Sequence, residues 1–244
     1  MIPKPEGGFL PCFTLVPKKD YVIDWASWKV VGMAGTGSYD VIVEDAFVPS
    51  HRLLSFPNAV GSAGPGAEVL KTPLYRISLL TCVPFTLVTP AVAAAAGAID
   101  RFVEENRVRA THGAVVLGGR KIADFQTVQK RVGEASARID ACRLLAQRDV
   151  REAEAEVRER GAQSLETRLR NRRTQSFTAH EAQVAMNLVF DAVGGRALSY
   201  DHPTQRAWRD VAAINHHISL NFDAVMSMYG QHLDRKSTRL NSSH

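Results

Sequence analysis

The chain has 244 residues, of which 45% are hydrophobic and 23% are charged, a composition typical of a soluble globular protein with one sizeable core or two small ones. The formal net charge of +5 is mild and gives no basis for nucleic-acid binding, which requires basic residues clustered on one face. Cys12, Cys82 and Cys142 are too far apart for a disulfide framework or a structural zinc site. We therefore expect a protein of the reducing cytoplasm.

The amino-terminal residues contain no apolar stretch of the kind found in a signal peptide. The longest apolar run, residues 87–99, is interrupted by Thr89 and Pro90 and is too short to cross a bilayer. The sequence therefore predicts neither a secretory leader nor a membrane span.

Residues 1–66 have the pattern of β-structure followed by a glycine-rich linker. Apolar or alternating runs predict strands at 9–16, 28–31 and 39–48. The glycine-rich stretch 32–38 between them lacks the spacing of a phosphate-binding loop, so we interpret it as a strand connection. Three strands are too few for an independent sheet with both faces covered. We interpret this part as a partial β-domain.

Residues 67–233 are predicted to be helical. The expected helices span residues 91–109, 125–160, 165–193 and 203–229. Pro84 and Pro90 predict that any helix before residue 91 is short or kinked. The last helix is expected to break near His216 and His217. Four helices joined by short links make a bundle.

Residues 234–244 read Asp-Arg-Lys-Ser-Thr-Arg-Leu-Asn-Ser-Ser-His. This resembles the in-frame translation of a common sequencing adaptor, so we exclude it from the fold, as we would a fusion scar. Its composition is too polar to offset the entropy of ordering, and we expect it to be disordered.

Three short features follow one another in the carboxy-terminal part. Gly194-Gly195 follows a helix, Pro203 opens the next one, and Arg209-Asp210 lies six and seven residues after that proline. This arrangement resembles the carboxy-terminal helical domain of the acyl-CoA dehydrogenase superfamily, and residues 28–52 are similar to that family's last β-strands. The resemblance implies an α+β fragment, in which the end of a β-domain precedes an acyl-CoA-dehydrogenase-like four-helix bundle. It also implies a chain cut at both ends.

The dehydrogenases of this family place a catalytic glutamate eight residues after the aspartate. That position is Ile218 here, and an isoleucine cannot abstract a proton. His217 matches instead the histidine of the branch of two-component flavin-dependent aromatic monooxygenases, and the resemblance makes it the candidate catalytic residue. By itself, a lone histidine in a helix is more often an ordinary core or surface residue. His216, about 100° away around the helix, should face elsewhere.

The resemblance also implies a flavin-binding set. Arg109 and Thr111 lie in Arg-Ala-Thr-His-Gly, which is similar to the family's Arg-x-x-Phe-Gly and has His112 in place of the phenylalanine. The other implied cofactor-binding residues are Phe125 and Gln126, in the family's Phe-Gln-x-x-Gln motif, and Gly194 and Gly195.

Ordinary structural roles remain possible for residues of this set. Arg109 can be a cationic helix end that favours the helix dipole, and Phe125 can be plain core. The family's usual glutamine and third glycine are Asp191 and Ala197 here. A carboxylate near a pyrophosphate is repulsive, which favours FMN or a loosely held FAD.

The resemblance implies the oxygenase component of a two-component flavin-dependent monooxygenase. Its expected substrates are an aromatic or phenolic small molecule, reduced flavin (FMN or FAD) and O2, and its expected partners are a separate flavin reductase and copies of itself in a homotetramer. His180, His202 and His232 show no metal spacing, so we expect no metal. The alternatives are a related flavoenzyme with other chemistry (N- or S-oxygenation, or dehydrogenation) and an inert truncated bundle. We expect the chain as given to be inactive alone.

Overall fold

The computed structural model describes residues 2–3, 7–60, 64–111 and 119–241. The chain divides into two compact units, a β-containing unit and a helical unit. The β-containing unit comprises Met1–Val30, Ala34–Val83 and Arg151–Arg168, and the helical unit comprises Val31–Met33, Pro84–Val150 and Leu169–His244.

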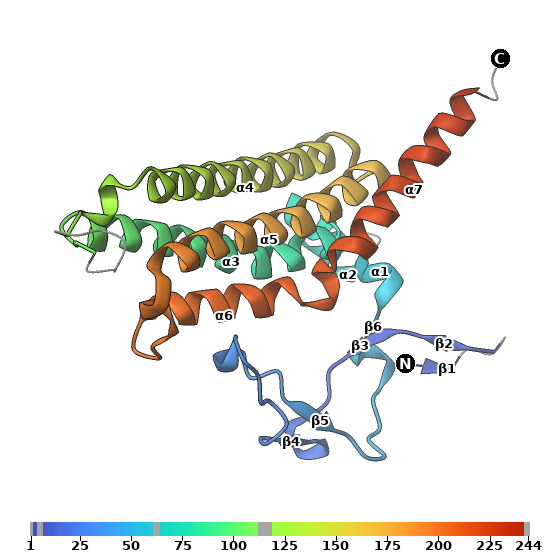
Figure 1. Ribbon diagram of the computed structural model, residues 1–244. Helices are drawn as coiled ribbons and strands as arrows, with labels where there is room; N and C mark the ends of the chain where they lie inside the picture. The colour runs from blue at the N-terminus through green and yellow to red at the C-terminus, as the bar shows by residue number, and fades with distance from the viewer. Residues whose placement is uncertain (1, 4–6, 61–63, 112–118, 242–244) are drawn as a thin grey trace. The chain divides into compact units, whose positions relative to one another are not determined.

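The described residues of the β-containing unit form six short strands in three antiparallel pairs (Figure 1). They are β1 (Ile2–Pro3) with β2 (Phe9–Leu10), β3 (Cys12–Thr14) with β6 (Leu53–Ser55), and β4 (Val22–Asp24) with β5 (Asp40–Ile42). Two-stranded pairs are marginal by themselves, in keeping with a partial β-domain. Two short helices, α1 (Phe56–Val60) and α2 (Pro65–Val69), follow β6, and residues 61–63 of the expected linker lie outside the described residues.

The strand prediction is corrected in three places. Residues 28–31 form no strand, and the unexpected β4 lies earlier. The alternating run 39–48 is extended only at Asp40–Ile42, because Asp45 adopts a positive φ of 47° that a strand cannot contain. The run 9–16 is divided at Pro11, which has no N–H to donate to a ladder.

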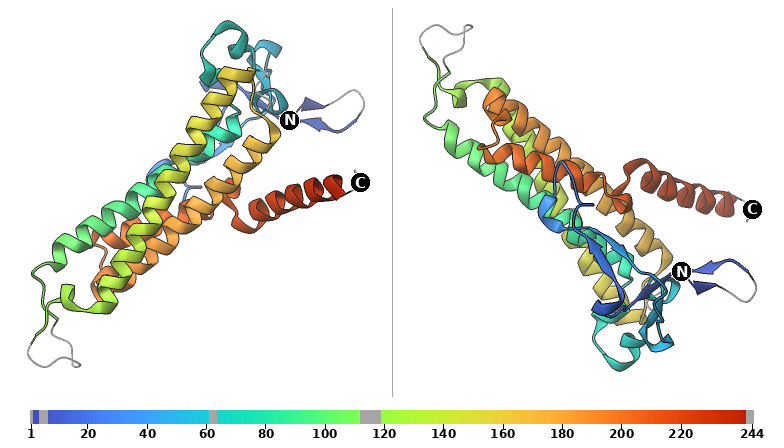
Figure 2. Two further views of the ribbon diagram at one scale, coloured as in Figure 1. Left: turned by 90° about the horizontal axis from the view of Figure 1, so that it is seen from above. Right: turned by 90° about the horizontal axis from the view of Figure 1, so that it is seen from below.

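The helical unit contains most of each helix of the predicted bundle. Figures 1 and 2 show its helices side by side: α3 (Leu79–Asn106), α4 (Gln126–Arg160), α5 (Leu165–Val193) and α6 (Pro203–Asn215). Its core is built mostly from small side chains, among them the fully buried Ala91, Ala95, Ala135, Ala179 and Ala182. Small residues let the helix backbones approach closely, and Ile139 and Met186 fill the larger spaces.

Helix α3 differs from the prediction at both ends. It begins at Leu79 and contains Pro84 and Pro90, which the sequence analysis expected to limit it. Burial of Pro84 in the packed interior outweighs the lost backbone hydrogen bond. The helix ends at Asn106, whose amide donates to the carbonyl of Phe102 at 2.7 Å, so Arg109 lies beyond it.

By length and composition, α3 is apolar enough to cross a membrane. The apolar segment is therefore longer than the run of residues 87–99 on which the prediction of no membrane span was based. The core helix of a soluble protein has the same composition. Val88, Ala95 and Phe102 of α3 lie buried in the core of the helical unit.

The predicted break near the histidines is present. Helix α6 ends at Asn215, a short 3-10 helix, η7 (Ile218–Leu220), follows, and α7 (Phe222–Asn241) begins after it. Helix α7 continues through residues 234–241, where the sequence analysis expected disorder. Extending an existing helix requires no new nucleus, so a polar segment can continue one that has already formed.

Candidate functional site

Arg109 and Thr111 are held next to the start of α4 by backbone pairing. The Arg109 carbonyl accepts the N–H of Ile122 at 2.9 Å, and the Thr111 N–H donates to the carbonyl of Arg120 at 2.9 Å. Ala110 and Lys121 form an antiparallel bridge between these contacts. Two predicted cofactor residues therefore lie where the chain returns towards α4, while His112 of the same motif lies outside the described residues.

Phe125 and Gln126 mark the beginning of α4. Phe125 follows η5 (Ile122–Asp124), and its carbonyl accepts the N–H groups of Val128 and Gln129. The Arg120 guanidinium lies 5.0 Å from the centroid of the half-buried Phe125 ring, so this residue both packs and carries a cation. The Gln126 side chain is exposed at the helix start, where N–H groups point away from the helix.

The charge of Arg109 is influenced by two neighbouring charged residues, Arg196 and Glu105. Its guanidinium donates to the side-chain oxygen of Asn106 at 3.5 Å. Burial lowers the pKa of Arg109, the positive charge of Arg196 lowers it further, and Glu105 opposes both effects. A partly desolvated guanidinium beside a second one gains strongly from a bound anion. Arg196 was missed in the sequence, although it directly follows the glycine pair.

The backbone requires glycine at position 194 but not at position 195. Gly194 ends α5 with a φ of +71°, which favours glycine. Gly195 has no such φ, and a Cβ added there would meet nothing within 4 Å. Both are exposed, so Gly195 leaves open backbone next to Arg196.

His202 joins this end of the bundle to α3. It caps α6 by accepting the Thr204 N–H on Nδ1 at 3.3 Å, and its Nε2 lies 3.6 Å from a carboxylate oxygen of Glu105. Figures 1 and 2 show the α5–α6 connection and the end of α3 at the same end of the helical unit. The cofactor candidates therefore gather at one end.

The Arg209-Asp210 pair has a structural task inside the helical unit. Asp210 accepts the N–H of Met33 at 2.6 Å, and Arg209 donates to the carbonyl of Val31. Gly32 is buried between them, and a Cβ there would lie 2.1 Å from the Arg209 carbonyl oxygen. We call these contacts of residues 31–33 with α6 the 31–33 clasp.

His217 lies at the opposite end of α6 from the glycine pair. Helix α6 has 13 residues, a length of about 20 Å. His217 is exposed, caps η7, and is followed by Ile218 with 88% of its surface exposed. The neighbouring His216 contacts the carbonyl of Ala212 through Nδ1 at 2.8 Å. Within one chain, the catalytic candidate is therefore separate from the cofactor candidates.

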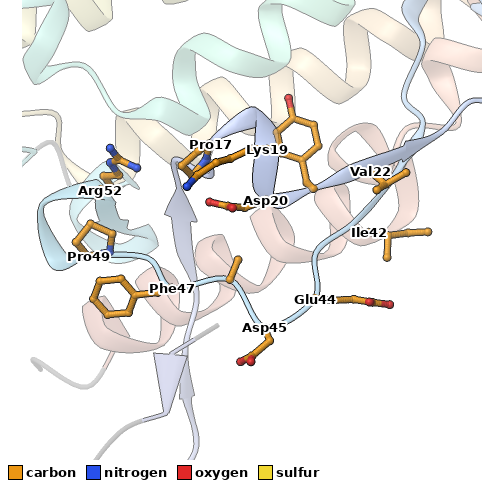
Figure 3. A pocket seen from close by; sticks show the side chains of 12 residues that line it. Pro17, Lys19, Asp20, Val22, Ile42, Glu44, Asp45, Phe47, Pro49 and Arg52 are labelled. Carbon is orange, nitrogen blue, oxygen red and sulfur yellow. The ribbon is translucent and has the colours of Figure 1, made fainter.

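An open groove of about 1020 Å³ lies in the β-containing unit, lined by carboxylates such as Asp20 and Glu44 and by Phe47 (Figure 3). None of the seven candidate residues lines it. Across the described part of the chain, no group of three or more His, Cys, Asp or Glu side chains is placed to hold a metal ion.

The fold is a helical bundle in which six of the seven candidate residues lie at one end and His217 lies at the other. Residues 85–222 match the family model for the acyl-CoA dehydrogenase carboxy-terminal domain, so the chain belongs to the acyl-CoA dehydrogenase superfamily. It is 41% identical over 234 residues to the oxygenase component of the FADH(2)-dependent resorcinol hydroxylase of Rhizobium sp. (strain MTP-10005), a match that covers 94% of the chain and 57% of that protein.

Two further relatives have names of the same kind, a flavin-dependent monooxygenase subunit and a hydroxylase. The oxygenase subunit HsaA of the flavin-dependent monooxygenase of Rhodococcus jostii (strain RHA1) is 37% identical over 218 residues, covering 88% of the chain and 56% of HsaA. The crystal structure of the 3-HSA hydroxylase from Rhodococcus sp. RHA1 superposes with a TM-score of 0.83 at 35% identity, covering 93% of the chain and 57% of that structure. The chain thus spans a little over half the length of these relatives.

Proposed function

We propose that the whole protein to which this chain belongs is the oxygenase component of a two-component flavin-dependent monooxygenase that hydroxylates an aromatic or phenolic small molecule. The observation that carries the proposal is the pair His217–Ile218. An exposed imidazole stands next to the position where the family's dehydrogenases carry their carboxylate base, and that position is an isoleucine. The relatives with the same kind of activity in their names support it.

We call the end of the helical unit that holds Gly194 and Gly195 the glycine end. Its residues fit the phosphate of a reduced flavin, FMN or FAD. Arg109 and Arg196 supply two guanidinium groups, and Gly195 leaves backbone open for close approach. Gln126 and Thr111 add hydrogen-bonding groups, and Phe125 adds an aromatic face. Because His217 lies at the other end of α6, one complete site would combine these two ends from different copies of the chain. This arrangement accords with the predicted homotetramer, which light scattering tests.

Reduced flavin with O2 supplies an electrophilic oxygen atom and two electrons. With the two electrons of the flavin, one oxygen atom of O2 would convert a ring C–H bond to C–OH and the other would leave as water. His217 would hydrogen-bond the substrate oxygen and carry a proton at its ring nitrogen. A positioned acid–base group of this kind contributes on the order of a hundredfold or more in rate. A separate flavin reductase would supply the reduced flavin, and a cytoplasmic location remains our prediction.

The test uses the protein expressed from its complete reading frame, with a flavin reductase, NADH, O2 and a panel of phenols that includes resorcinol. Hydroxylated product and hydrogen peroxide are measured together. We expect His217→Ala to lower product formation by about a hundredfold while O2 consumption continues, because flavin would still bind at the glycine end. His216→Ala is the matched control and should couple normally.

Two results would count against the proposal. Normal product formation by His217→Ala removes the histidine from the reaction. Oxidation at nitrogen or sulfur with no phenol hydroxylated would favour the alternative chemistry. The 244-residue chain alone should consume O2 no faster than free reduced flavin does.

A further inference from the structure

The ring of His217 has a defined tautomer. Its Nδ1 accepts the backbone N–H of Ser219 at 3.2 Å, and the Ser219 hydroxyl lies 2.7 Å from the same nitrogen. A backbone N–H can only donate, so Nδ1 must present its lone pair. The neutral ring therefore carries its proton on Nε2, and the exposed side of the imidazole is a donor.

The segment that imposes this tautomer is fastened to α5. Arg172 donates to the carbonyl of Ser219, and the buried Ser176 hydroxyl donates to the carbonyl of Leu220 at 2.9 Å. Leu220 is fully buried. Residues 172 and 176 are one helical turn apart, so both side chains emerge from one face of α5 and bind consecutive carbonyls of η7.

A second hydrogen bond and partial burial hold Arg172 in its contact with the Ser219 carbonyl. Its guanidinium also donates to Gln175 at 3.1 Å, and burial lowers the pKa of Arg172. A partly desolvated guanidinium is costly unless its donors are used, so Arg172 strongly favours the conformation in which the Ser219 carbonyl accepts from it. A solvent-exposed 3-10 turn without such contacts would exchange conformations freely.

We propose that Ser219 and Arg172 are positioning residues for His217: Arg172 fixes η7, and Ser219 occupies Nδ1 so that Nε2–H is presented as a hydrogen-bond donor to the substrate oxygen. This proposal rests on the proposed function for the identity of that oxygen. Its first step, the fixed tautomer, stands on the geometry alone.

The tautomer is measured first, on the 244-residue chain labelled with ¹⁵N-histidine, from nitrogen–proton correlations of the imidazole ring. We expect His217 to carry its proton on Nε2, with Nδ1 unprotonated and hydrogen-bonded. Ser219→Ala keeps the backbone N–H and should keep this tautomer, whereas Ser219→Pro removes that N–H and should make the Nδ1–H form detectable. An Nδ1–H tautomer in the unsubstituted chain overturns the proposal whatever the enzyme does.

The catalytic consequence is measured in the complete protein as the ratio of hydroxylated product to hydrogen peroxide. We expect Ser219→Pro and Arg172→Met each to lower this ratio about five- to tenfold, the value of one hydrogen bond, without changing flavin affinity. Ser219→Ala, which keeps the backbone N–H, should retain the ratio. Arg173→Met is the control, since Arg173 lies on the same helix but packs over the ring of Tyr229 at 4.4 Å.

The outcomes separate the two proposals. If His217→Ala couples normally, the proposed function of His217 fails, while the tautomer experiment still tests the positioning. If His217→Ala uncouples the reaction but Ser219→Pro and Arg172→Met do not, the positioning role is overturned and the function stands.

Discussion

Replacing Gly32 by alanine tests the 31–33 clasp. An alanine Cβ would lie 2.1 Å from the carbonyl oxygen and 2.5 Å from the carbonyl carbon of Arg209. Both atoms belong to the backbone of α6, so neither can swing aside as a flexible side chain would. Residues 31–33 must therefore move away from α6 by about 1 Å or more to reach a normal van der Waals separation.

That movement breaks the hydrogen bonds of the clasp. The Met33 N–H lies 2.6 Å from Asp210, and an outward shift takes it beyond hydrogen-bonding distance. A hydrogen bond to a charged group contributes about 1.5–3 kcal/mol, and the more exposed Arg209–Val31 contact contributes less. We expect a loss of about 2–3 kcal/mol. The loss is limited to the stability of the clasp itself, because the segment can detach without unfolding the bundle.

The assay is thermal unfolding followed by circular dichroism, together with hydrogen exchange of the Met33 amide. For a chain of this size, the expected loss lowers the midpoint by roughly 5–10 °C and removes the protection of that amide. Gly35→Ala is the matched control, since a Cβ there meets nothing within 4 Å. The reasoning is refuted if both variants unfold at the same temperature and the Met33 amide of Gly32→Ala stays protected.

Three further predictions follow from burial and backbone conformation. Deleting residues 234–244 should leave the thermal midpoint within about 1 °C, since Asp234 and Arg235 are exposed; a larger drop would show that the segment packs. Gly194→Ala, at a φ of +71°, should cost about 1 kcal/mol in denaturant unfolding, whereas Gly195→Ala should cost less than about 0.5 kcal/mol and instead weaken flavin binding. Iodoacetamide at pH 8 should label Cys12 but not Cys142, because burial excludes the reagent and raises the pKa of Cys142 to about 12; mass spectrometry of the native chain would expose the opposite result.

The long helices could be predicted from the sequence because their signals are local. Helix α5 spans the predicted residues 165–193, and α6 begins at the predicted Pro203. Apolar residues at three- and four-residue spacing, a glycine at the end and a proline at the start all act within a few residues. Helix α3 was mispredicted because burial of Pro84 is a tertiary effect.

The strands were predicted less well because their pairing is non-local. β3 pairs with β6, which lies some forty residues later in the chain, so no short window contains both partners. The alternation around Val41 and Ile42 predicts a strand with one buried face and one exposed face. In the described chain, both side chains are about half exposed, so neither face is buried. Residues 28–31 form no strand, and the Val31 carbonyl accepts from Arg209 in the clasp instead of joining a ladder.

The candidate site divides in the same way. Arg109, Gln126 and His217 could be found because they belong to short motifs. Arg196 and His202 could not, since Arg196 acts through its charge on Arg109 and His202 through its contact with Glu105 of α3, both distant in sequence. The Arg172–Ser219 contact joins residues 47 apart, and only the His-x-Ser spacing hinted at a local side-chain-to-backbone bond.

The fold alone explains several residues that a motif comparison would assign to function. Arg209 and Asp210 hold residues 31–33, and Gly194 supplies the backbone conformation that ends α5. Nothing in the packing requires glycine at position 195, and nothing requires an imidazole on the exposed turn at His217.

Residues that folding leaves unexplained are where ligand chemistry has room to act. Gly195 and His217 lie at opposite ends of α6, about 20 Å apart, so no single copy of this bundle brings the proposed phosphate-binding residues to its histidine. If the proposed function holds, a loss of assembly should therefore abolish hydroxylation even when every side chain named above is intact.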